Sequence, residues 1–143
     1  MAIEKTATAE WRGGLKDGTG KISTQSGVLS SQPYGFNTRF EGQPGTNPEE
    51  LIGAAHAGCF SMALSLILGN EGMTADKIET TATVTLEQQN GGFAITKCHL
   101  DTEITVNGGN KEKVLECANT AKENCPVSKV LSCDITMDAR AVV

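Results

Sequence analysis

The sequence predicts an α+β fold, in which strand-forming segments and helix-forming segments occupy separate stretches of the chain. Apolar residues alternate with a period of two in residues 6–12 and again in residues 78–106. The period changes to about 3.6 in residues 47–68 and in residues 110–124, as expected for helices. The chain has 143 residues, of which 38% are hydrophobic, and this size predicts a single domain over residues 1–143.

The N-terminal segment is predicted to form a meander of short strands. Residues 6–12 alternate like a half-buried strand, and the glycines and aspartate of residues 13–18 indicate a turn before a short strand at residues 21–24. We predict a third strand at residues 36–40. The glycines and proline of residues 41–46 then indicate a loop.

The start of the long helix is marked by several agreeing signals. Asn47 suits the N-cap, Pro48 suits the first helical position, and Glu49 and Glu50 lie in the first turn, where the helix dipole favours negative charge. Apolar residues form one stripe that further apolar residues broaden, so we expect a central helix ending near Gly69. The stripe consists of Leu51, Ala55, Cys59, Met62 and Leu66, and Ile52, Phe60, Ala63 and Ile67 broaden it.

The C-terminal half is predicted to begin with a hairpin and to end with a strand. Residues 78–89 and 93–106 alternate on either side of a glycine-rich turn, and a change of phase in the second strand indicates a bulge near Lys97. Residues 110–124 are typical of an amphipathic helix, and a short helical turn follows. Residues 134–142 alternate as a last strand.

Composition and charge exclude several classes of function. The formal net charge is -5 and the basic residues are scattered singly, so we expect no nucleic-acid partner. The first residues contain no apolar signal segment, and we expect no apolar run long enough to span a bilayer, no membrane partner and a cytoplasmic protein. Because only 4% of residues are aromatic, a monomer has few large side chains to bury, and we expect an oligomer.

Cysteine usage indicates thiol chemistry rather than a disulfide scaffold. The five cysteines lie at positions 59, 98, 117, 125 and 133, and no two of them form a C-x-x-C pair. Cys59 lies among small residues in the long helix, and Cys125 precedes Pro126, which makes it the expected cap of the short helix. If the two sulfurs meet, they can cycle between dithiol and disulfide, as in a thiol oxidoreductase or peroxidase.

A reactive Cys59 requires a positive partner, because burial among apolar residues raises the pKa of a thiol. His56 is the ionisable group next to Cys59 on the same helix face, and Arg39 is the best candidate from another segment. We expect His56 to be a hydrogen-bonded core residue. Glu49 on residue pattern alone is a helix-start residue.

The pattern leaves other interpretations open. Free cysteine is among the most buried residue types, so we expect Cys98, Cys117 and Cys133 to be structural. A metal site would need Cys59, Cys125 and a third ligand such as His99, and we predict none. A protein that binds a small hydrophobic ligand or senses oxidation without turnover is the competing class.

Three segments resemble the OsmC/Ohr family of organic hydroperoxide reductases. They are residues 32–42, residues 45–60 and Cys125-Pro126-Val127-Ser128, and the resemblance extends along essentially the whole chain. It implies an OsmC/Ohr-like intertwined homodimer with long central helices packed between antiparallel β-sheets. It implies a thiol peroxidase without bound metal or flavin, which a dithiol such as a lipoylated protein reduces again.

The resemblance also implies a role for four residues. Cys59 is the peroxidatic cysteine and Cys125 the resolving cysteine, while Arg39 steadies the thiolate and Glu49 orients Arg39. Glu49 and Cys59 are about 15 Å apart along a continuous helix, so the glutamate is expected to serve the cysteine of a second subunit across a two-fold axis. The small residues around Cys59 are expected to leave an apolar pocket for alkyl or lipid-derived peroxides.

Overall fold

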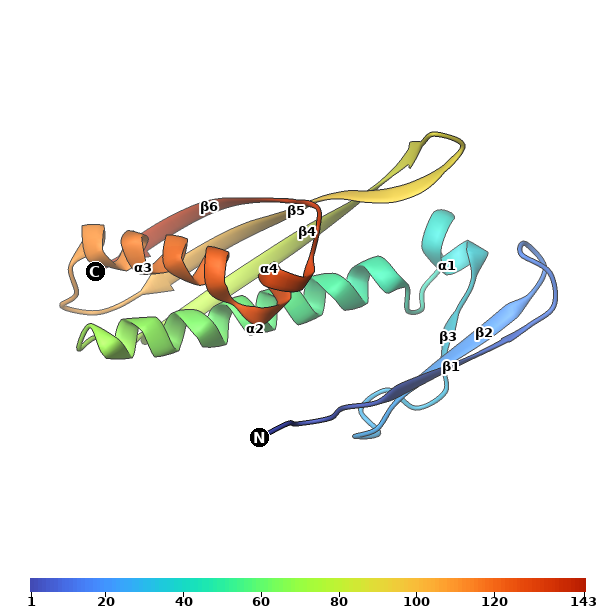
Figure 1. The fold of residues 1–143 in the computed structure, drawn as a ribbon, viewed down its shortest axis with the longest axis horizontal. Coiled ribbons are helices and arrows are strands. Elements are labelled where there is room, and N and C mark those ends of the chain that lie inside the picture. The colour runs from blue at the N-terminus through green and yellow to red at the C-terminus, as the bar shows by residue number, and fades with distance from the viewer. The chain divides into compact units, whose positions relative to one another are not determined.

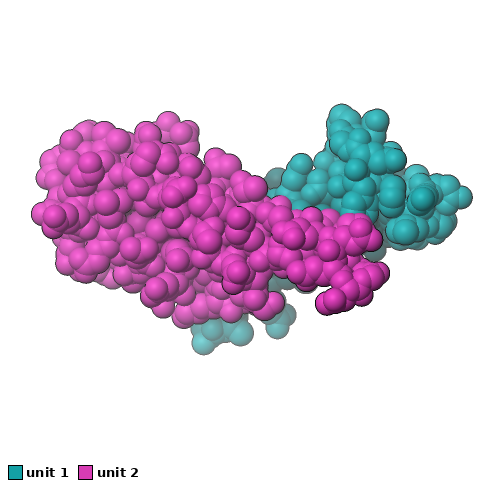
Figure 2. Space-filling view, turned by 90° about the horizontal axis from the view of Figure 1, so that it is seen from above, with its two compact units in different colours: residues 1–51 teal, residues 52–143 magenta.

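Strands and helices occur in separate stretches along the chain, which confirms the α+β prediction. The computed structural model describes residues 1–143, and it falls into two compact units, residues 1–51 and residues 52–143 (Figures 1 and 2). The prediction of a single domain over the whole chain stays a prediction. The elements are β1 (Ala7–Arg12), β2 (Thr19–Thr24), β3 (Gln32–Tyr34), α1 (Phe36–Phe40), α2 (Pro48–Asn70), β4 (Lys77–Gln89), β5 (Gly92–Thr105), α3 (Lys111–Asn124), α4 (Pro126–Val130) and β6 (Asp134–Val142).

The first unit is an antiparallel sheet of order β1-β2-β3 followed by a single helical turn. The predicted strand at residues 36–40 is wrong, because α1 occupies these residues. The Thr38 hydroxyl accepts a hydrogen bond from the Gly35 backbone N–H at 2.8 Å, and the rings of Phe36 and Phe40 stack across the turn at 4.9 Å. These local contacts at a spacing of three and four residues favour a helical turn over the extended form that the aromatic residues suggested.

This first sheet buries little apolar surface of its own. All six residues of β1 are exposed, and the Trp11 ring lies against the Tyr34 ring, with ring centroids 5.5 Å apart. Gly20 lies beneath these two rings, and a Cβ there would collide with both. The aromatic pair therefore requires glycine at this position.

The second unit is built on a sheet of order β4-β5-β6. β4 and β5 form the predicted antiparallel hairpin, and their register shifts where Thr85 pairs with Lys97 and Leu86 with Ile95. The extra residue, Thr96, confirms the predicted bulge near Lys97. β6 pairs parallel to β5, and the crossover connection through α3 and α4 makes this direction possible (Figure 1).

Helix α2 buries a different stripe from the predicted one. Its buried residues follow a spacing of three and four, and they are Gly53, His56, Phe60, Leu64 and Leu68. Gly53 allows close approach to β4, because a Cβ there would lie 3.4 Å from the Ala82 carbonyl oxygen. Met62 and Leu66 are 76% and 66% exposed, so a second apolar stripe of α2 lies open.

The core of the second unit joins α2, α3 and the sheet. Phe60, Leu64 and Leu68 of α2 pack with side chains of β5 and α3, all of which are fully buried or nearly so. Those partners include Leu100, Ile104, Val114, Ala118 and Ala121. Cys117 and Cys125 belong to the same cluster, and Cys98 is fully buried as well.

The expectation that no apolar segment could span a bilayer is corrected by α2. By length and composition alone, residues 48–70 are apolar enough to cross a membrane. A central helix of a soluble protein meets the same criterion, and α2 supplies much of the core of the second unit.

Candidate active site

The thiols of Cys59 and Cys125 are neighbours in the second unit. Cys59 projects from the middle of α2, and Cys125 lies between α3 and α4. The Cys59 side chain packs against the core cluster that contains Cys125, burial and the neighbouring Cys125 thiol raise the pKa of Cys59, and both cysteines are free thiols. Residues 66 positions apart in sequence are thus placed where a disulfide between them can form and break.

Cys125 is held by the first turn of α4. It is the N-cap of this helix, Pro126 follows at the first position, and the Cys125 sulfur accepts a hydrogen bond from the Ser128 backbone N–H at 3.4 Å. The capping position predicted from Cys125-Pro126 is confirmed. The side chain of Cys125 is fully buried, so its sulfur is presented only to the groups packed around it.

The groups around Cys59 in residues 52–143 favour its thiol form over the thiolate. Burial raises the pKa of the Cys59 thiol, the Val127 backbone N–H donates to its sulfur and lowers the pKa, and the neighbouring Cys125 thiol raises it. The net direction is upwards. None of the groups that shift the pKa of Cys59 is a cation. Peroxide chemistry needs the thiolate, so a positive group must come from elsewhere.

The hydrogen bonds of His56 go to Cys98 and Ser128, and Ser128 connects it to Cys125. It is fully buried, its Nδ1 lies 2.9 Å from Cys98 Sγ, and its Nε2 lies 2.7 Å from Ser128 Oγ. Burial lowers the pKa of His56, so the imidazole is neutral near pH 7. Ser128 and Cys98 did not emerge from the sequence as site residues. The one signal for Ser128 was its place three residues after a capping cysteine.

Arg39 and Glu49 form a two-pronged ion pair within the first unit. Arg39 Nε donates to Glu49 Oε1 at 2.9 Å, and Arg39 Nη2 donates to Glu49 Oε2 at 3.0 Å. The Arg39 guanidinium also lies 5.3 Å from the Phe40 ring centroid. The last turn of α1 and the first turn of α2 thus fix the direction of the guanidinium. Arg39 and Glu49 are paired as expected, and their catalytic roles stay predictions.

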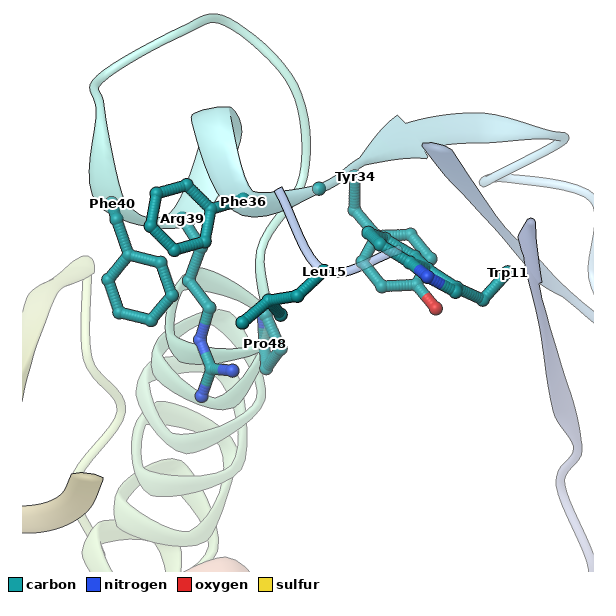
Figure 3. A pocket seen from close by; sticks show the side chains of 8 residues that line it. Trp11, Leu15, Tyr34, Phe36, Arg39, Phe40 and Pro48 are labelled. Carbon is teal, nitrogen blue, oxygen red and sulfur yellow. The ribbon is translucent and has the colours of Figure 1, made fainter. Parts of the chain in front are cut away.

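An aromatic pocket of about 320 Å³ adjoins Arg39 within the first unit (Figure 3). Figure 3 shows the Arg39 side chain beside the Phe36 and Phe40 rings. The lining residues are Trp11, Leu15, Tyr34, Gly35, Phe36, Arg39, Phe40 and Pro48. A mostly apolar pocket with one guanidinium in its wall suits a ligand that carries both an alkyl or aryl group and a polar oxygen.

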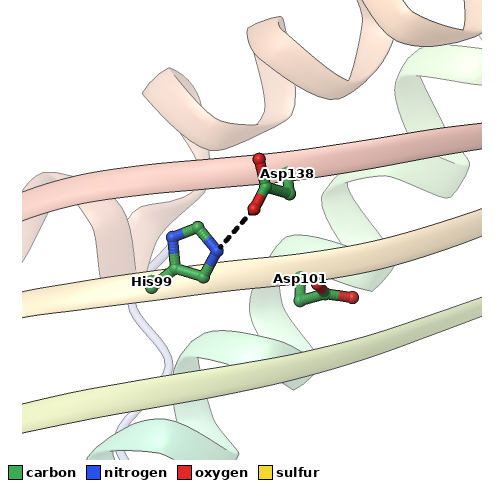
Figure 4. Close-up of side chains that lie close together, drawn as sticks. All are labelled: His99, Asp101 and Asp138. Carbon is green, nitrogen blue, oxygen red and sulfur yellow. Dashed lines mark ion pairs between the residues drawn. The ribbon is translucent and has the colours of Figure 1, made fainter.

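His99, Asp101 and Asp138 lie close together on the second sheet (Figure 4). His99 Nε2 lies 3.3 Å from Asp138 Oδ2, and Arg140 Nη2 donates to Asp101 Oδ1 at 2.9 Å. Arg140 lowers the pKa of Asp101 and already neutralises it. Asp101 is therefore already paired with a cation of the protein itself.

The chain matches known proteins over most of its length. Residues 40–140 match the family model described as OsmC-like protein. The chain is 56% identical over 138 residues to peroxiredoxin OsmC of Escherichia coli (strain K12), covering 96% of each chain. It is 34% identical over 125 residues to organic hydroperoxide resistance protein OhrB of Bacillus subtilis (strain 168), covering 87% of this chain and 88% of OhrB. The crystal structure of Bacillus subtilis OhrB superposes with a TM-score of 0.70 at 31% identity, over 94% of this chain and 98% of that one. The chain therefore belongs to the OsmC-like protein family, in which relatives are named for peroxiredoxin activity and for organic hydroperoxide resistance.

Proposed function

We propose that this protein is a thiol peroxidase that reduces organic hydroperoxides to alcohols. The observation that carries the proposal is the packing of the free Cys59 and Cys125 thiols in the same core cluster. The names of its relatives, peroxiredoxin and organic hydroperoxide resistance protein, support the same activity. Because all five cysteines are free thiols, a reducing compartment suits the chain, and we place the activity in the cytoplasm.

The proposed reaction has three balanced steps. The Cys59 thiolate attacks one oxygen of R–O–O–H, the O–O bond breaks, and the departing alkoxide takes a proton to become R–OH. Cys59 is left as a sulfenic acid. The Cys125 sulfur attacks the Cys59 sulfur and water leaves, which gives a disulfide, and an external dithiol reduces the disulfide again. A dithiol such as a lipoylated protein suits the last step, and no metal or flavin takes part.

The cation for Cys59 comes, in this proposal, from a second copy of the chain. Arg39 is aimed by Glu49, yet Glu49 and Cys59 are about 15 Å apart along one helix. A homodimer in which two α2 helices pack about a two-fold axis brings Arg39 of one subunit to Cys59 of the other. The exposed stripe of α2, which includes Met62 and Leu66, supports this packing because it is apolar and open.

The substrate class follows from the surroundings of Arg39. The guanidinium can stabilise both the thiolate and the negative charge that develops on the leaving oxygen. The aromatic rings of Phe36 and Phe40 beside it provide apolar surface for an alkyl or aryl group. Hydrogen peroxide has no such group, so cumene hydroperoxide is expected to be the better substrate.

The test is turnover of cumene hydroperoxide with dihydrolipoamide as the reductant. Cys59→Ser is expected to abolish turnover. Cys125→Ser is expected to complete one reduction and then stop, with Cys59 over-oxidised to the sulfinic acid and visible by intact mass. Cys117→Ser, which changes a buried thiol outside the pair, is the matched control and is expected to retain turnover. Unchanged turnover in Cys59→Ser would exclude a peroxidase that acts through Cys59.

A protein that binds a hydrophobic ligand or senses oxidation is the second candidate. The aromatic pocket beside Arg39 favours it, because such a pocket can bind an apolar ligand without chemistry. The same assay separates the two functions. A sensor consumes one equivalent of peroxide and then stays oxidised in the presence of dihydrolipoamide, whereas the enzyme consumes many.

A further inference from the structure

Beyond the two cysteines, a buried chain of hydrogen bonds leads from Cys125 into the core. We propose that His56 and Ser128 form a proton relay that activates Cys125 for its attack on oxidised Cys59. The proposal rests on the proposed peroxidase function and assigns the positioning residues of its second step.

The relay consists of contacts that are all short and all sheltered from solvent. Cys125 Sγ lies 3.0 Å from Ser128 Oγ, and Ser128 Oγ lies 2.7 Å from His56 Nε2. His56 Nδ1 lies 2.9 Å from Cys98 Sγ on the other side of the ring. Cys98, Cys125 and His56 are fully buried and Ser128 is 8% exposed. Water therefore cannot easily replace any of these partners.

The direction of the hydrogen bonds decides whether the chain can carry a proton. With the His56 proton on Nδ1, this nitrogen donates to the Cys98 sulfur and Nε2 accepts from the Ser128 hydroxyl. The Ser128 oxygen is then free to accept from the Cys125 thiol. In this tautomer the Cys98 sulfur accepts from Nδ1 and the basic nitrogen of His56 faces Ser128.

The relay would accept the Cys125 proton during attack on the Cys59 sulfenic acid. Cys125 must lose its proton as its sulfur bonds to the Cys59 sulfur. The proton moves to Ser128 while the Ser128 proton moves to His56 Nε2, so that the imidazole becomes doubly protonated. The hydroxide leaves Cys59 on the side opposite Cys125, takes a proton from solvent and departs as water, and His56 gives its extra proton back to solvent through Ser128. The products are one disulfide and one water, and His56 returns to its neutral form.

The surroundings of His56 offer it no other proton partner of comparable strength. The titratable group that touches it is the Cys98 thiol on β5, and the Cys125 thiol at the start of α4 is connected to it through Ser128. Cys59 and Cys133 lie one step further away, next to Cys125 and Cys98 respectively. Burial lowers the pKa of His56 and keeps the imidazole neutral, so one ring nitrogen is available as a proton acceptor.

Single-turnover measurements on Ser128→Ala and His56→Gln test the relay. After one equivalent of cumene hydroperoxide, loss of the Cys59 thiol reports the first step, and the lifetime of the sulfenic acid, trapped with dimedone, reports the second. The first step is expected to stay within about twofold of wild type, because the hydrogen bonds of both residues go to groups other than Cys59. The second step is expected to slow by about 10²-fold, the usual effect of losing a general base. Sulfinic acid should then accumulate at lower peroxide concentrations than in wild type.

The pH profile separates a relay from a structural role. Without the relay, Cys125 must lose its proton to solvent, so disulfide formation in both variants should accelerate about tenfold per pH unit below the thiol pKa. Wild type should show a flatter profile. Ser128→Thr keeps the hydroxyl and is expected to restore both the rate and the profile.

A matched control removes a buried hydroxyl elsewhere in the same unit. Thr102 is fully buried and its hydroxyl lies 3.0 Å from that of Thr80, so Thr102→Val tests whether any such loss slows the reaction. The relay is wrong if Ser128→Ala and His56→Gln form the disulfide with wild-type rate and profile. It is also wrong if Thr102→Val slows the second step equally.

Oxidation by diamide keeps this test independent of the peroxidase. Diamide first adds to Cys59, and Cys125 then displaces it to form the same disulfide, so the relay predicts the same slowing in both variants. If wild type does not reduce cumene hydroperoxide, the proposed function is wrong. The diamide comparison would still decide the relay.

Discussion

The two compact units of this chain differ in whether they have a core of their own. Residues 52–143 contain all of the buried apolar side chains, and all of these except Cys98 belong to one cluster around Phe60, Leu64 and Leu68. Residues 1–51 contain none, and β1 is exposed on both faces. The hydrophobic effect therefore stabilises the second unit directly, whereas the first unit needs another surface to pack against.

The chemical groups are divided between the units in the same way. Cys59 and Cys125 lie in the unit with a core, where packing holds the sulfurs together, and they lack a cation. Arg39 and Glu49 lie in the unit without a core, where an ion pair fixes their geometry. If Arg39 serves Cys59 as proposed, packing of the first unit completes the site, and assembly is coupled to reactivity.

Complementation between two inactive variants would show where the cation acts, and it has the largest expected effect. Arg39→Met is expected to lower turnover by about 10³-fold, because one stabilising cation is lost from the transition state. Cys59→Ser is expected to be inactive. Unfolded together and refolded, the two should regain about a quarter of wild-type activity, because about half of the dimers are mixed and each has one intact site.

The control is Arg39→Met refolded with wild type at the same ratio, which measures how refolding and mixing alone change the activity. No recovery from the two inactive variants, with mixed dimers demonstrated by native mass spectrometry, would place Arg39 and Cys59 of the same chain together. A protein that is monomeric by light scattering and retains full turnover would exclude a site divided between subunits.

Truncation in the core should have the next largest effect, because only the second unit contains a packed interior. Leu64 is fully buried, and Leu64→Ala is expected to lower the free energy of unfolding by about 3 kcal/mol. Val130 is 76% exposed, so Val130→Ala should change it by less than about 0.5 kcal/mol. Urea unfolding monitored by circular dichroism measures both. Equal losses would mean that Val130 is covered in the assembled protein.

The sequence predicted the second unit better than the first, and the reason is physical. The long helix, the hairpin, its bulge and the last strand follow from periodicity, because each buries one side against a core. Residues 36–40 were predicted as a strand because of their aromatic residues. They form a helical turn because their short-range contacts favour it more strongly.

The site shows the same limit of periodicity. Cys59 and Cys125 stood out from their local sequence, but the connection of His56 to Cys125 through Ser128 depends on the packing of α2 against α4. Spacing along the chain carries no signal for it. The stripe of α2 that faces the core was also misjudged, because this helix is apolar on more than one side.

A smaller effect is expected from acidification, and it should be confined to the second unit. Burial holds the pKa of His56 below its ordinary value of 6.5, so the unfolded chain binds this proton more readily than the folded one. Stability should therefore fall as the pH drops below about 6.5, by at most about 1.4 kcal/mol per pH unit. His56→Gln should flatten this slope in urea titrations between about pH 7 and pH 5. A slope equal to that of wild type would show that other groups cause it.

The smallest expected effect concerns Gly58, and it separates an open helix from a covered one. Gly58 lies on the exposed side of α2, where an added Cβ would meet nothing within 4 Å. In an open helix, Gly58→Ala should therefore stabilise the protein by up to about 1 kcal/mol through helix propensity. If a second α2 covers this stripe, the methyl group meets the partner helix and weakens the dimer instead. We expect the second result, measured as an increased dissociation constant in sedimentation equilibrium with unchanged helix content. A more stable variant with unaltered association would mean that the stripe is open and that the dimer, if it forms, uses another surface.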